Sequence, residues 1–481
     1  MGVLLGLEPQ KVFYWFEEIT KIPHGSGNVG RISDFLVEFA ESRNLAVTQD
    51  ALKNVIMVGE ATPGYEKEPT VILQGHMDMV AVKKPESAVD LQTEGLRVGV
   101  EGDNIYAEGT SLGGDDGIAV AYALAILDSD DIPHPRLEVV ITVDEEVGMD
   151  GAAGIDLSAL QGNRLLNLDS EEEGIFLTSC AGGARVNCRL PLERSMGEGR
   201  VLTLQIDGLL GGHSGEEIHK GRGNANLLLG RVLWALAQKY PLRLVSISGG
   251  LADNAIPRTA EAVFLVEDEE VTDLLQKLRE DIAGELAVRD PGFDMRWTIG
   301  ERRERREAVP AQAGKGAFAM LAGLPNGVQS MSAQVPGLVE TSLNLGILCF
   351  ADGILTAEFS VRSSVESAKE ALIGQLRAIL YSCGGNVEVS GDYPGWKYRA
   401  DSPFREKMIR VFRKMYGRDP ELKAIHAGLE CGILGSKIPD PDCVSIGPDM
   451  KDIHTTEETL SISSTARVWE YLLALLAEKE A

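Results

Sequence analysis

The sequence predicts an α/β protein that is interrupted by an α+β region. Buried strands alternate with amphipathic helices at both ends of the chain, whereas the middle contains alternating-pattern strands with helices between them. A chain of 481 residues is also too long for one ordinary core. We therefore expect an α/β domain formed by residues 1–180 and 392–481, and an α+β domain formed by residues 181–391.

Apolar periodicity and Gly/Pro punctuation define the elements of the α/β domain. Helices are expected at 9–19, 29–43, 118–127, 403–416 and 461–478. Buried strands are expected at 54–58, 71–74, 136–143, 164–168 and 443–446, with a loop around the segment HAGLECG.

The middle region repeats a pattern of strands and helices. Strands are expected at 201–207, 242–247, 260–266 and 295–299, and again at 343–349, 355–361 and 387–389. Helices are expected at 224–240, 270–286 and 365–381. We interpret this region as two successive strand-helix-strand-strand-helix-strand units.

Composition excludes several classes of partner. A net charge of −27 argues against nucleic acid and against anionic membrane surfaces. No apolar run reaches the roughly 18 residues that span a bilayer, and the N-terminus lacks the basic start of a secretory signal. The six cysteines show no CxxC spacing, which is typical of reduced thiols. We therefore expect a cytoplasmic protein.

Three predicted strands end in side chains that can bind metal ions. The strand in VILQGHMDMV ends at His76 and Asp78, RLEVVITV leads to Glu145 and Glu146, and RLLNL leads to Asp169. In open α/β sheets this edge is where ligands bind. Carboxylates gathered there repel one another unless cations neutralise them.

Two further segments add to this set. Asp115 and Asp116 stand at the start of a predicted helix, and one of them would suffice as the helix cap. His454 follows the last predicted strand. Each segment alone also has a plain structural explanation, as a solvated turn, a capping residue or an acidic loop. Their occurrence together favours a metal site.

Eight segments carry a resemblance to a known family: GHMDMV, SLGGDDGIAVA, VDEEVGMDGA, LLNLDSEE, GGHSGEEIHKGRGNAN, DNAIPR, IHAGLECG and DIHTTEE. Together they resemble the aminoacyl-histidine dipeptidases, the Xaa-His or cytosol non-specific dipeptidases of the dizinc carnosinase and carboxypeptidase G superfamily. The resemblance covers practically the whole chain. It implies a catalytic α/β domain with a mixed, mainly parallel sheet flanked by helices, and an inserted α+β lid domain.

The resemblance implies two divalent metal ions. Zinc suits histidine and carboxylate ligands in an open site, and manganese or cobalt would also fit. The implied ligands are His76, Asp115 and Asp169 for one ion, and Asp115, Glu146 and His454 for the other.

The resemblance also implies the catalytic residues. Asp78 would orient His76, and Glu145 would be the general base for a metal-activated water. The implied activity is the hydrolysis of unblocked L-dipeptides, including Xaa-His.

Residues of the lid and of the HAGLECG loop are implied to contact the substrate. His213 would stabilise the oxyanion, and Asn254 and Arg362 would hold the C-terminal carboxylate, for which the planar guanidinium is well suited. A surface strand charge is the alternative for Arg362. The loop from Gly428 to Glu430 would line the pocket, with Glu430 meeting the substrate's amine.

The repeated pattern of the lid bears on how His213 reaches its substrate. Relatives with a short lid complete the site across a dimer, whereas this chain contains both halves of a lid. We therefore expect His213 to act within its own chain, and a homodimer remains open.

Two other functions are compatible with the motifs. An amide deacylase acting on N-acyl amino acids would keep the metal ligands and differ at the amine and carboxylate contacts. A non-catalytic, metal-stabilised binding protein would not need Glu145.

Overall fold

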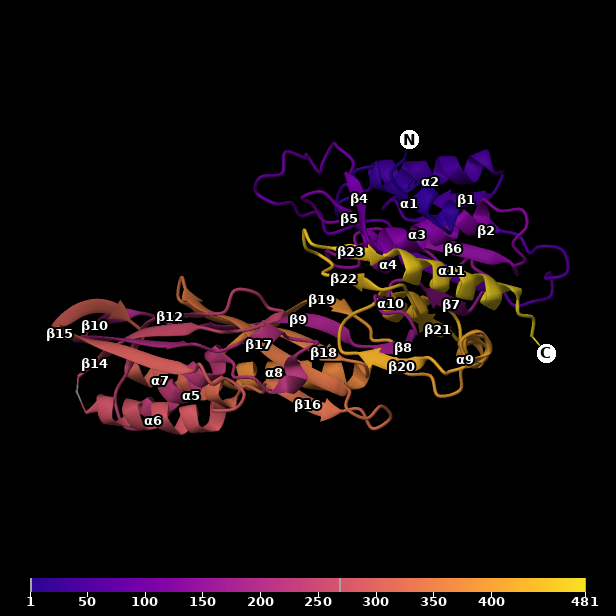
Figure 1. Cartoon of the computed structure of the whole chain (residues 1–481). Helices are drawn as coiled ribbons and strands as arrows, with labels where there is room; N and C mark the ends of the chain where they lie inside the picture. The colour runs from indigo at the N-terminus through magenta and orange to yellow at the C-terminus, as the bar shows by residue number, and fades with distance from the viewer. Residues whose placement is uncertain (1, 268–269, 481) are drawn as a thin grey trace. The chain divides into compact units, whose positions relative to one another are not determined.

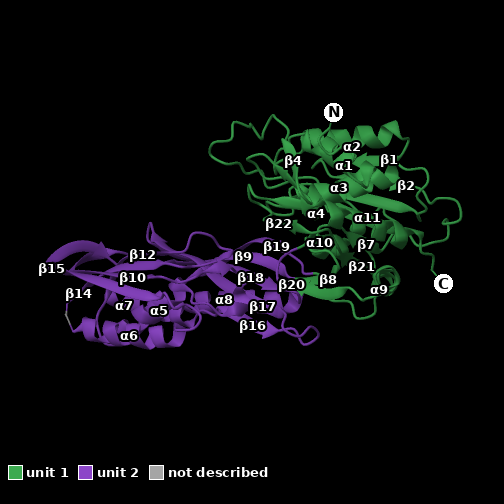
Figure 2. Cartoon of the chain, viewed as in Figure 1, with its two compact units in different colours: residues 1–180, 396–424, 429–481 green, residues 181–395, 425–428 purple. Residues whose placement is uncertain are grey.

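The computed structural model describes residues 2–267 and 270–480, which form two compact units (Figure 2). Unit 1 comprises residues 1–180, 396–424 and 429–481. Unit 2 comprises residues 181–395 together with the short segment 425–428.

Unit 1 is built on an eight-stranded sheet with the order β1-β2-β6-β3-β7-β21-β8-β20. Strands β6, β3, β7 and β21 run parallel, while β1 pairs antiparallel with β2, β2 with β6, and β8 with β21. The strands are β1 (Ala46–Gln49), β2 (Val55–Gly59), β3 (Val71–His76), β6 (Leu137–Thr142), β7 (Arg164–Asn167), β8 (Ile175–Cys180), β20 (Glu421–Ile425) and β21 (Asp442–Ser445). This mixed, mainly parallel sheet confirms the predicted fold class.

The two faces of this sheet carry different kinds of side chain, because successive side chains of a strand point to opposite faces. On one face, alternate residues such as Leu73, Val139 and Leu166 join one apolar core with α1, α2, α3, α9 and α11. The other face carries Gln74 and Asn167, which are also buried. The helices are α1 (Gln10–Thr20), α2 (Gly30–Ser42), α3 (Gly114–Leu127), α4 (Asp150–Gly154), α9 (Pro403–Tyr416), α10 (Glu430–Lys437) and α11 (Ile462–Ala477).

A second, four-stranded sheet in unit 1 has the order β22-β23-β5-β4. Its strands are β4 (Val98–Glu101), β5 (Asn104–Ala107), β22 (Met450–Lys451) and β23 (Thr459–Ser461). The turn between β22 and β23 carries His454.

The described residues of unit 2 form a nine-stranded sheet, a two-stranded sheet and four α-helices, and Figure 1 shows α5, α6 and α7 on one face of the larger sheet. All four helices share one apolar core with the sheet. The helices are α5 (Ala225–Ala237), α6 (Val271–Leu286), α7 (Ala311–Gly323) and α8 (Glu366–Ser382). The strands are β9 (Gly182–Pro191), β10 (Ser195–Asp207), β12 (Arg243–Gly249), β14 (Ala260–Val266), β15 (Asp294–Ala308), β16 (Gly327–Met331), β17 (Val339–Ala351), β18 (Ile354–Ser363) and β19 (Asn386–Tyr393).

The sheet of unit 2 contains one strand order twice. One half, β10-α5-β12-β14-α6-β15, lies in the sheet as β15-β10-β14-β12. The other, β9-α7-β17-β18-α8-β19, lies as β19-β9-β18-β17. The halves meet where β12 pairs antiparallel with β17, with Ser248 opposite Cys349. Asn224 also joins them, because it accepts from the backbone N–H groups of Asn226 and Leu227 in α5 and donates to the Leu345 carbonyl in β17 at 3.0 Å.

The two halves are not successive in the chain, and this part of the sequence interpretation was wrong. The first half is inserted into the second, between β9 and α7. The sequence interpretation missed this arrangement because it lacked two of the elements. Helix α7 has the sequence AQAGKGAFAMLAG, whose glycines lower helix propensity, and β9 was not expected. Strand β15 also runs beyond 299 through the polar segment GERRERREA, because it pairs with β10 along its length.

The loop expected around HAGLECG is also shorter than predicted. It ends at Glu430, which begins helix α10. The helix fits its surroundings because Cys431, Ile433 and Leu434 are buried.

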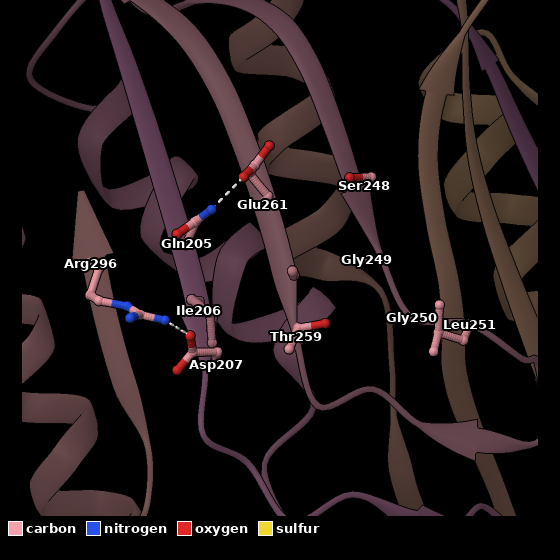
Figure 3. Close-up of a pocket in the computed structure, with 11 residues that line it drawn as sticks. Gln205, Ile206, Asp207, Ser248, Gly249, Gly250, Leu251, Thr259, Glu261 and Arg296 are labelled. Atoms are coloured by element: carbon pink, nitrogen blue, oxygen red, sulfur yellow. Dashed lines mark hydrogen bonds and ion pairs between the residues drawn. The ribbon is translucent and has the colours of Figure 1, made fainter. Parts of the chain in front are cut away.

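A cavity of about 500 Å³ opens on unit 2 among β10, β12, β14 and β15 (Figure 3). Its charged groups have partners, because Arg296 pairs with Asp207 and Gln205 donates to Glu261 at 2.6 Å. The described lining residues include no histidine or cysteine.

No described helix has the length and apolar character of a membrane span.

Candidate functional site

His76 is the last residue of β3, and its side chain is buried. Its Nδ1 lies 2.9 Å from the backbone carbonyl oxygen of Asp78. A carbonyl oxygen can only accept, so Nδ1 carries a proton and Nε2 is the nitrogen that faces the carboxylates of the cluster. This orientation would leave Nε2 to bind a metal ion once its proton is displaced.

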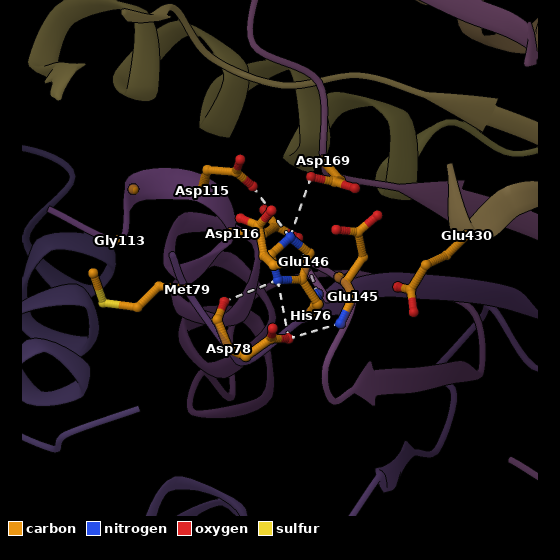
Figure 4. Close-up of polar contacts among 12 residues, drawn as sticks. His76, Asp78, Met79, Gly113, Asp115, Asp116, Glu145, Glu146, Asp169 and Glu430 are labelled. Carbon is orange, nitrogen blue, oxygen red and sulfur yellow. Dashed lines mark hydrogen bonds and ion pairs between the residues drawn. The ribbon is translucent and has the colours of Figure 1, made fainter. Parts of the chain in front are cut away.

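The Asp78 carboxylate connects three segments of unit 1 (Figure 4). It accepts from the Ser26 hydroxyl at 2.8 Å and from the backbone N–H of Glu145 at 3.1 Å, and its Oδ1 lies 3.5 Å from His76 Nδ1. Burial opposes ionisation, but the contacts with His76 and Ser26 hold the pKa of Asp78 below its ordinary value. Asp78 therefore fixes the His76 ring and the backbone of Glu145 together.

Asp115 lies between two histidines. Its Oδ1 is 3.1 Å from His76 Nε2, and its Oδ2 is 3.1 Å from His454 Nε2. Asp115 and Asp116 are joined by a cis peptide bond at the start of α3, and neither side chain caps the helix. Burial alone would raise the pKa of Asp115, but the two imidazoles hold it well below its ordinary value.

Two more carboxylates complete the cluster. Asp169 Oδ1 lies 3.6 Å from His76 Nε2, and Glu146 Oε1 lies 2.9 Å from His454 Nε2. Burial raises the pKa of Asp169 to about 6, and hydrogen bonds to Asp115 and Glu146 raise the pKa of His454 to about 10. All five predicted metal ligands are thus brought together.

The spacing of these atoms suits metal ions. Ligand atoms at about 2.1 Å around a tetrahedral ion lie about 3.4 Å from one another, and the pairs above lie 2.9 to 3.6 Å apart. Within the described residues, the groups able to hold an ion at this site are His76–Asp116–Asp169, His76–Glu145–Glu146 and Asp115–Glu146–His454. The residues therefore fit a pair of divalent ions. A further group, Glu366, Glu370 and Asp392, is exposed and already has Lys369 as a partner.

Glu145 follows β6 beside the cluster and is drawn with it in Figure 4. Burial, together with the nearby carboxylates of Asp169, Glu430 and Glu146, raises the pKa of Glu145 well above its ordinary value, against the opposing effect of His76.

Glu430 is fully buried and lies over the polar face of the sheet. Its carboxyl group accepts from Gln74 Nε2 at 2.5 Å and from Thr142 Oγ1 at 2.6 Å, and Asn167 donates to Gln74 at 2.6 Å. Burial raises the pKa of Glu430 to about 8. This network is not visible in the sequence, because its members come from four separate elements, β3, β6, β7 and α10.

The substrate-binding residues predicted in the lid lie near one another in unit 2. His213 in β11 (Gly212–His213) pairs with Ala255 in β13 (Ala255–Ile256), and the Ser214 N–H donates to the Asn254 carbonyl at 2.8 Å. A Cβ atom at Gly215 would lie 3.2 Å from His213 Cε1 and 3.3 Å from Arg362 Nε. His213, Asn254 and Arg362 are therefore brought together.

The surroundings of Arg362 leave its charge unbalanced, and those of His213 define its tautomer. Arg362 lies on β18 and is only 9% exposed, yet the residues that the structure describes offer it no ion-pair partner. His213 Nδ1 accepts from the Glu216 N–H at 3.2 Å, so Nε2 carries the proton. Burial and Arg362 lower the pKa of His213.

Gly428 and Glu430 fall in different units, because the segment 425–428 belongs to unit 2. This segment also carries His426. His426 Nε2 lies 2.7 Å from Ser342 Oγ, and burial together with Arg362 lowers its pKa to about 3.

An α/β domain with two histidines and several carboxylates at one sheet edge, interrupted by an α+β domain, is typical of metal-dependent hydrolases. The model of peptidase family M20/M25/M40 matches residues 72–478. The chain therefore belongs to peptidase family M20/M25/M40, as its motifs predicted.

Three known proteins illustrate this membership. A cytosol non-specific dipeptidase of Escherichia coli (strain K12) is 36% identical, over 99% of both chains. The crystal structure of aminoacylhistidine dipeptidase from Vibrio alginolyticus is also 36% identical, with a TM-score of 0.91 over 99% of both chains. The aminopeptidase PepT structure from Bacillus cereus, at 17% identity and a TM-score of 0.60 over 98% of both chains, shares the fold.

The raised pKa of Glu430 predicts a pH effect on the stability of the metal-free protein. In the unfolded chain the carboxyl has an ordinary pKa of 4.5, whereas burial raises the pKa of the folded carboxyl to about 8. The folded state therefore binds more protons in this range, and its free energy of unfolding should fall as pH rises from about 5 to 8. Glu430→Gln should flatten this fall in urea unfolding at pH 5.5, 7 and 8.5. Glu421→Gln, at an exposed position, is the control, and equal slopes in the two variants would contradict the buried acid.

Proposed function

We propose that the protein is a cytoplasmic metallodipeptidase that hydrolyses unblocked L-dipeptides, including Xaa-His peptides. The observation that carries this proposal is the placement of the Asp115 carboxylate. One of its oxygens lies 3.1 Å from His76 Nε2, and the other lies 3.1 Å from His454 Nε2. Such a carboxylate suits a bridge between two cations. The dipeptidase names of relatives that align over 99% of the chain support the substrate class.

The same geometry supports an assignment of the metal ligands. His76, Asp115 and Asp169 hold one ion, and Asp115, Glu146 and His454 hold the other. Zinc is favoured because the ligands are imidazoles and carboxylates, and manganese or cobalt would be accepted by the same set. Three carboxylates against two divalent ions leave a net positive centre.

Two divalent cations bound there supply a Lewis acid and lower the pKa of a water from 15.7 toward about 7. Glu145 accepts the proton of the attacking water and delivers it to the amine of the leaving residue. Asp78 keeps Glu145 in place through its backbone N–H and keeps His76 in its metal-binding orientation.

Unit 2 acts as the lid domain and contributes to substrate recognition. The Nε2–H of His213 is free to donate to the oxyanion that develops on the scissile carbonyl. Arg362 binds the substrate's C-terminal carboxylate together with Asn254, because a buried guanidinium without an ion-pair partner favours an anionic ligand.

Gly428 lines the dipeptide-binding pocket of the proposed enzyme. We assign Glu430 a structural role and not a contact with the substrate. The Glu430 carboxyl is enclosed by Gln74 and Thr142 and has no exposed surface. Its burial does not favour the contact with the substrate's amine that the sequence suggested.

A substrate panel tests the proposal. Zinc- and manganese-loaded protein is assayed with dipeptides, among them Xaa-His and β-alanyl-histidine, and with N-acyl amino acids. Turnover of free dipeptides is expected. Preference for N-acyl amino acids would instead indicate an amide deacylase, and no metal-dependent turnover would indicate a binding protein.

The first prediction concerns the general base. Glu145→Gln should keep both metal ions and the fold but lower kcat by at least about 10²-fold, because the amide cannot take a proton. Metal content is measured beside the kinetics. A stoichiometric loss of metal in this variant would mean that Glu145 is a ligand and that its role and that of Glu146 are exchanged.

The second prediction concerns the bridge. Asp115→Ala should lose both ions because Asp115 contacts both histidines, whereas His454→Ala should mainly weaken one ion. Metal stoichiometry after dialysis distinguishes the two. The bridged pair is refuted by equal losses in the two variants.

The third prediction is that His213 acts within its own chain. The chain contains both halves of the lid sheet, with His213 in the first half and Arg362 in the second. His213→Ala and Glu145→Ala chains are co-expressed with different tags, and mixed oligomers are isolated by tandem purification. Action within one chain predicts no activity, whereas action across a homodimer restores one complete site per dimer. A monomeric, active wild-type protein would also support action within one chain.

A further inference from the structure

Glu458 is a buried glutamate that the proposed mechanism does not use. It lies at the end of the turn between β22 and β23 and is 4% exposed. Its Oε2 accepts from the backbone N–H groups of Leu112 at 2.8 Å and Gly113 at 3.1 Å. Its Oε1 accepts from those of Gly114 at 2.8 Å and Asp115 at 3.4 Å.

The segment that receives this carboxylate is shaped for an anion. It spans the start of α3 and includes its first two residues, Gly114 and Asp115, where N–H groups lack intrahelical partners and the helix dipole favours negative charge. Gly113 has a φ of +68°, which brings successive N–H groups to one side, and a Cβ at Gly114 would lie 3.3 Å from Glu458 Oε1. A side chain from a distant part of the sequence therefore occupies an anion site directly before Asp115.

The same glutamate is the buried anchor of the turn that carries His454. None of residues 451–457 is buried, and the His454 side chain is 43% exposed. Glu458 follows four positions later and is fixed by four backbone donors. The position of His454 relative to Asp115 therefore depends on this contact, together with the pairing of β22 with β23 and the packing of Ile453 against the core.

We propose that Glu458 is a positioning residue that holds His454 and Asp115 at the spacing of one shared cation. This inference rests on the proposed pair of metal ions. It differs from simple helix capping, because a cap would stabilise α3 without selecting between the two ions.

Adjacent Glu457 provides a matched control. It carries the same charge and follows His454 on the same turn, but its side chain is 67% exposed and pairs with Lys84 at 2.6 Å. Glu457→Gln and Glu458→Gln thus remove the same charge at the surface and in the anion site, respectively.

The test is a Co²⁺ titration of metal-free protein, followed by calorimetry and visible absorption. Glu458→Gln should weaken one of the two ions about 10- to 100-fold, the usual effect of losing a group that orients a ligand. The visible spectrum of the Co²⁺ ion that Glu458→Gln still binds tightly should equal the spectrum of His454→Ala. Glu457→Gln should bind both ions with the affinities of the wild type. Unchanged binding of both ions, or equal weakening of both, overturns the inference. Failure of the wild type to bind two ions would instead contradict the proposed function.

A second measurement does not depend on the variant folding. In metal-free wild-type protein, the amides of Leu112 to Asp115 should exchange with deuterium as slowly as the interior of α3, because Glu458 accepts from each of them. Exchange as fast as that of the exposed turn 451–457 would show that the contact does not persist, and would refute the proposal.

Discussion

The electrostatic cost of gathering carboxylates at one sheet edge governs the structure of unit 1. Asp78, Asp115, Glu146 and Asp169 lie within reach of only two imidazoles, and buried like charges cost several kcal/mol unless they are compensated. The chain offers partial compensation through Ser26 and the Glu145 backbone, which stabilise Asp78. Divalent cations would complete it. The cluster is therefore stable as a binding site in a way that it would not be as a purely structural feature.

The two faces of the sheet stabilise these strand ends in different ways. One face is apolar and packs against α1, α2, α3, α9 and α11, which fixes the strands rigidly. The other holds a hydrogen-bonded chain from Asn167 through Gln74 to Glu430, directly behind the strand ends. These hydrogen bonds favour one arrangement of their members, because breaking any of them leaves a further buried polar group unpaired. The position of α10 is thus tied to the same strands that end in the candidate metal ligands.

Unit 2 contains the same strand arrangement twice within one chain. Two copies of a four-stranded arrangement pair through β12 and β17 and form a continuous sheet. Edge strands readily pair with other edges, so two such copies tend to associate. Placing both copies in one chain, one inserted into the other, satisfies these edges internally. The inserted half carries His213 and Asn254, while Arg362 lies in the half that surrounds it.

The sequence by itself determined the fold class and the family, and it predicted which histidines and carboxylates gather in unit 1. Strands such as Val71–His76 are marked by local hydrophobicity, and an acidic or imidazole side chain at a strand end needs no tertiary information to be noticed. Tertiary structure alone decided the insertion of one lid half into the other, the helix that begins at Glu430, and the burial of His426. It also decided the pairing of Glu458 with the backbone of 112–115, across 343 to 346 positions of sequence. The physical reason is that a backbone N–H has no sequence signature. Which distant carboxylate meets it depends on packing, not on local pattern.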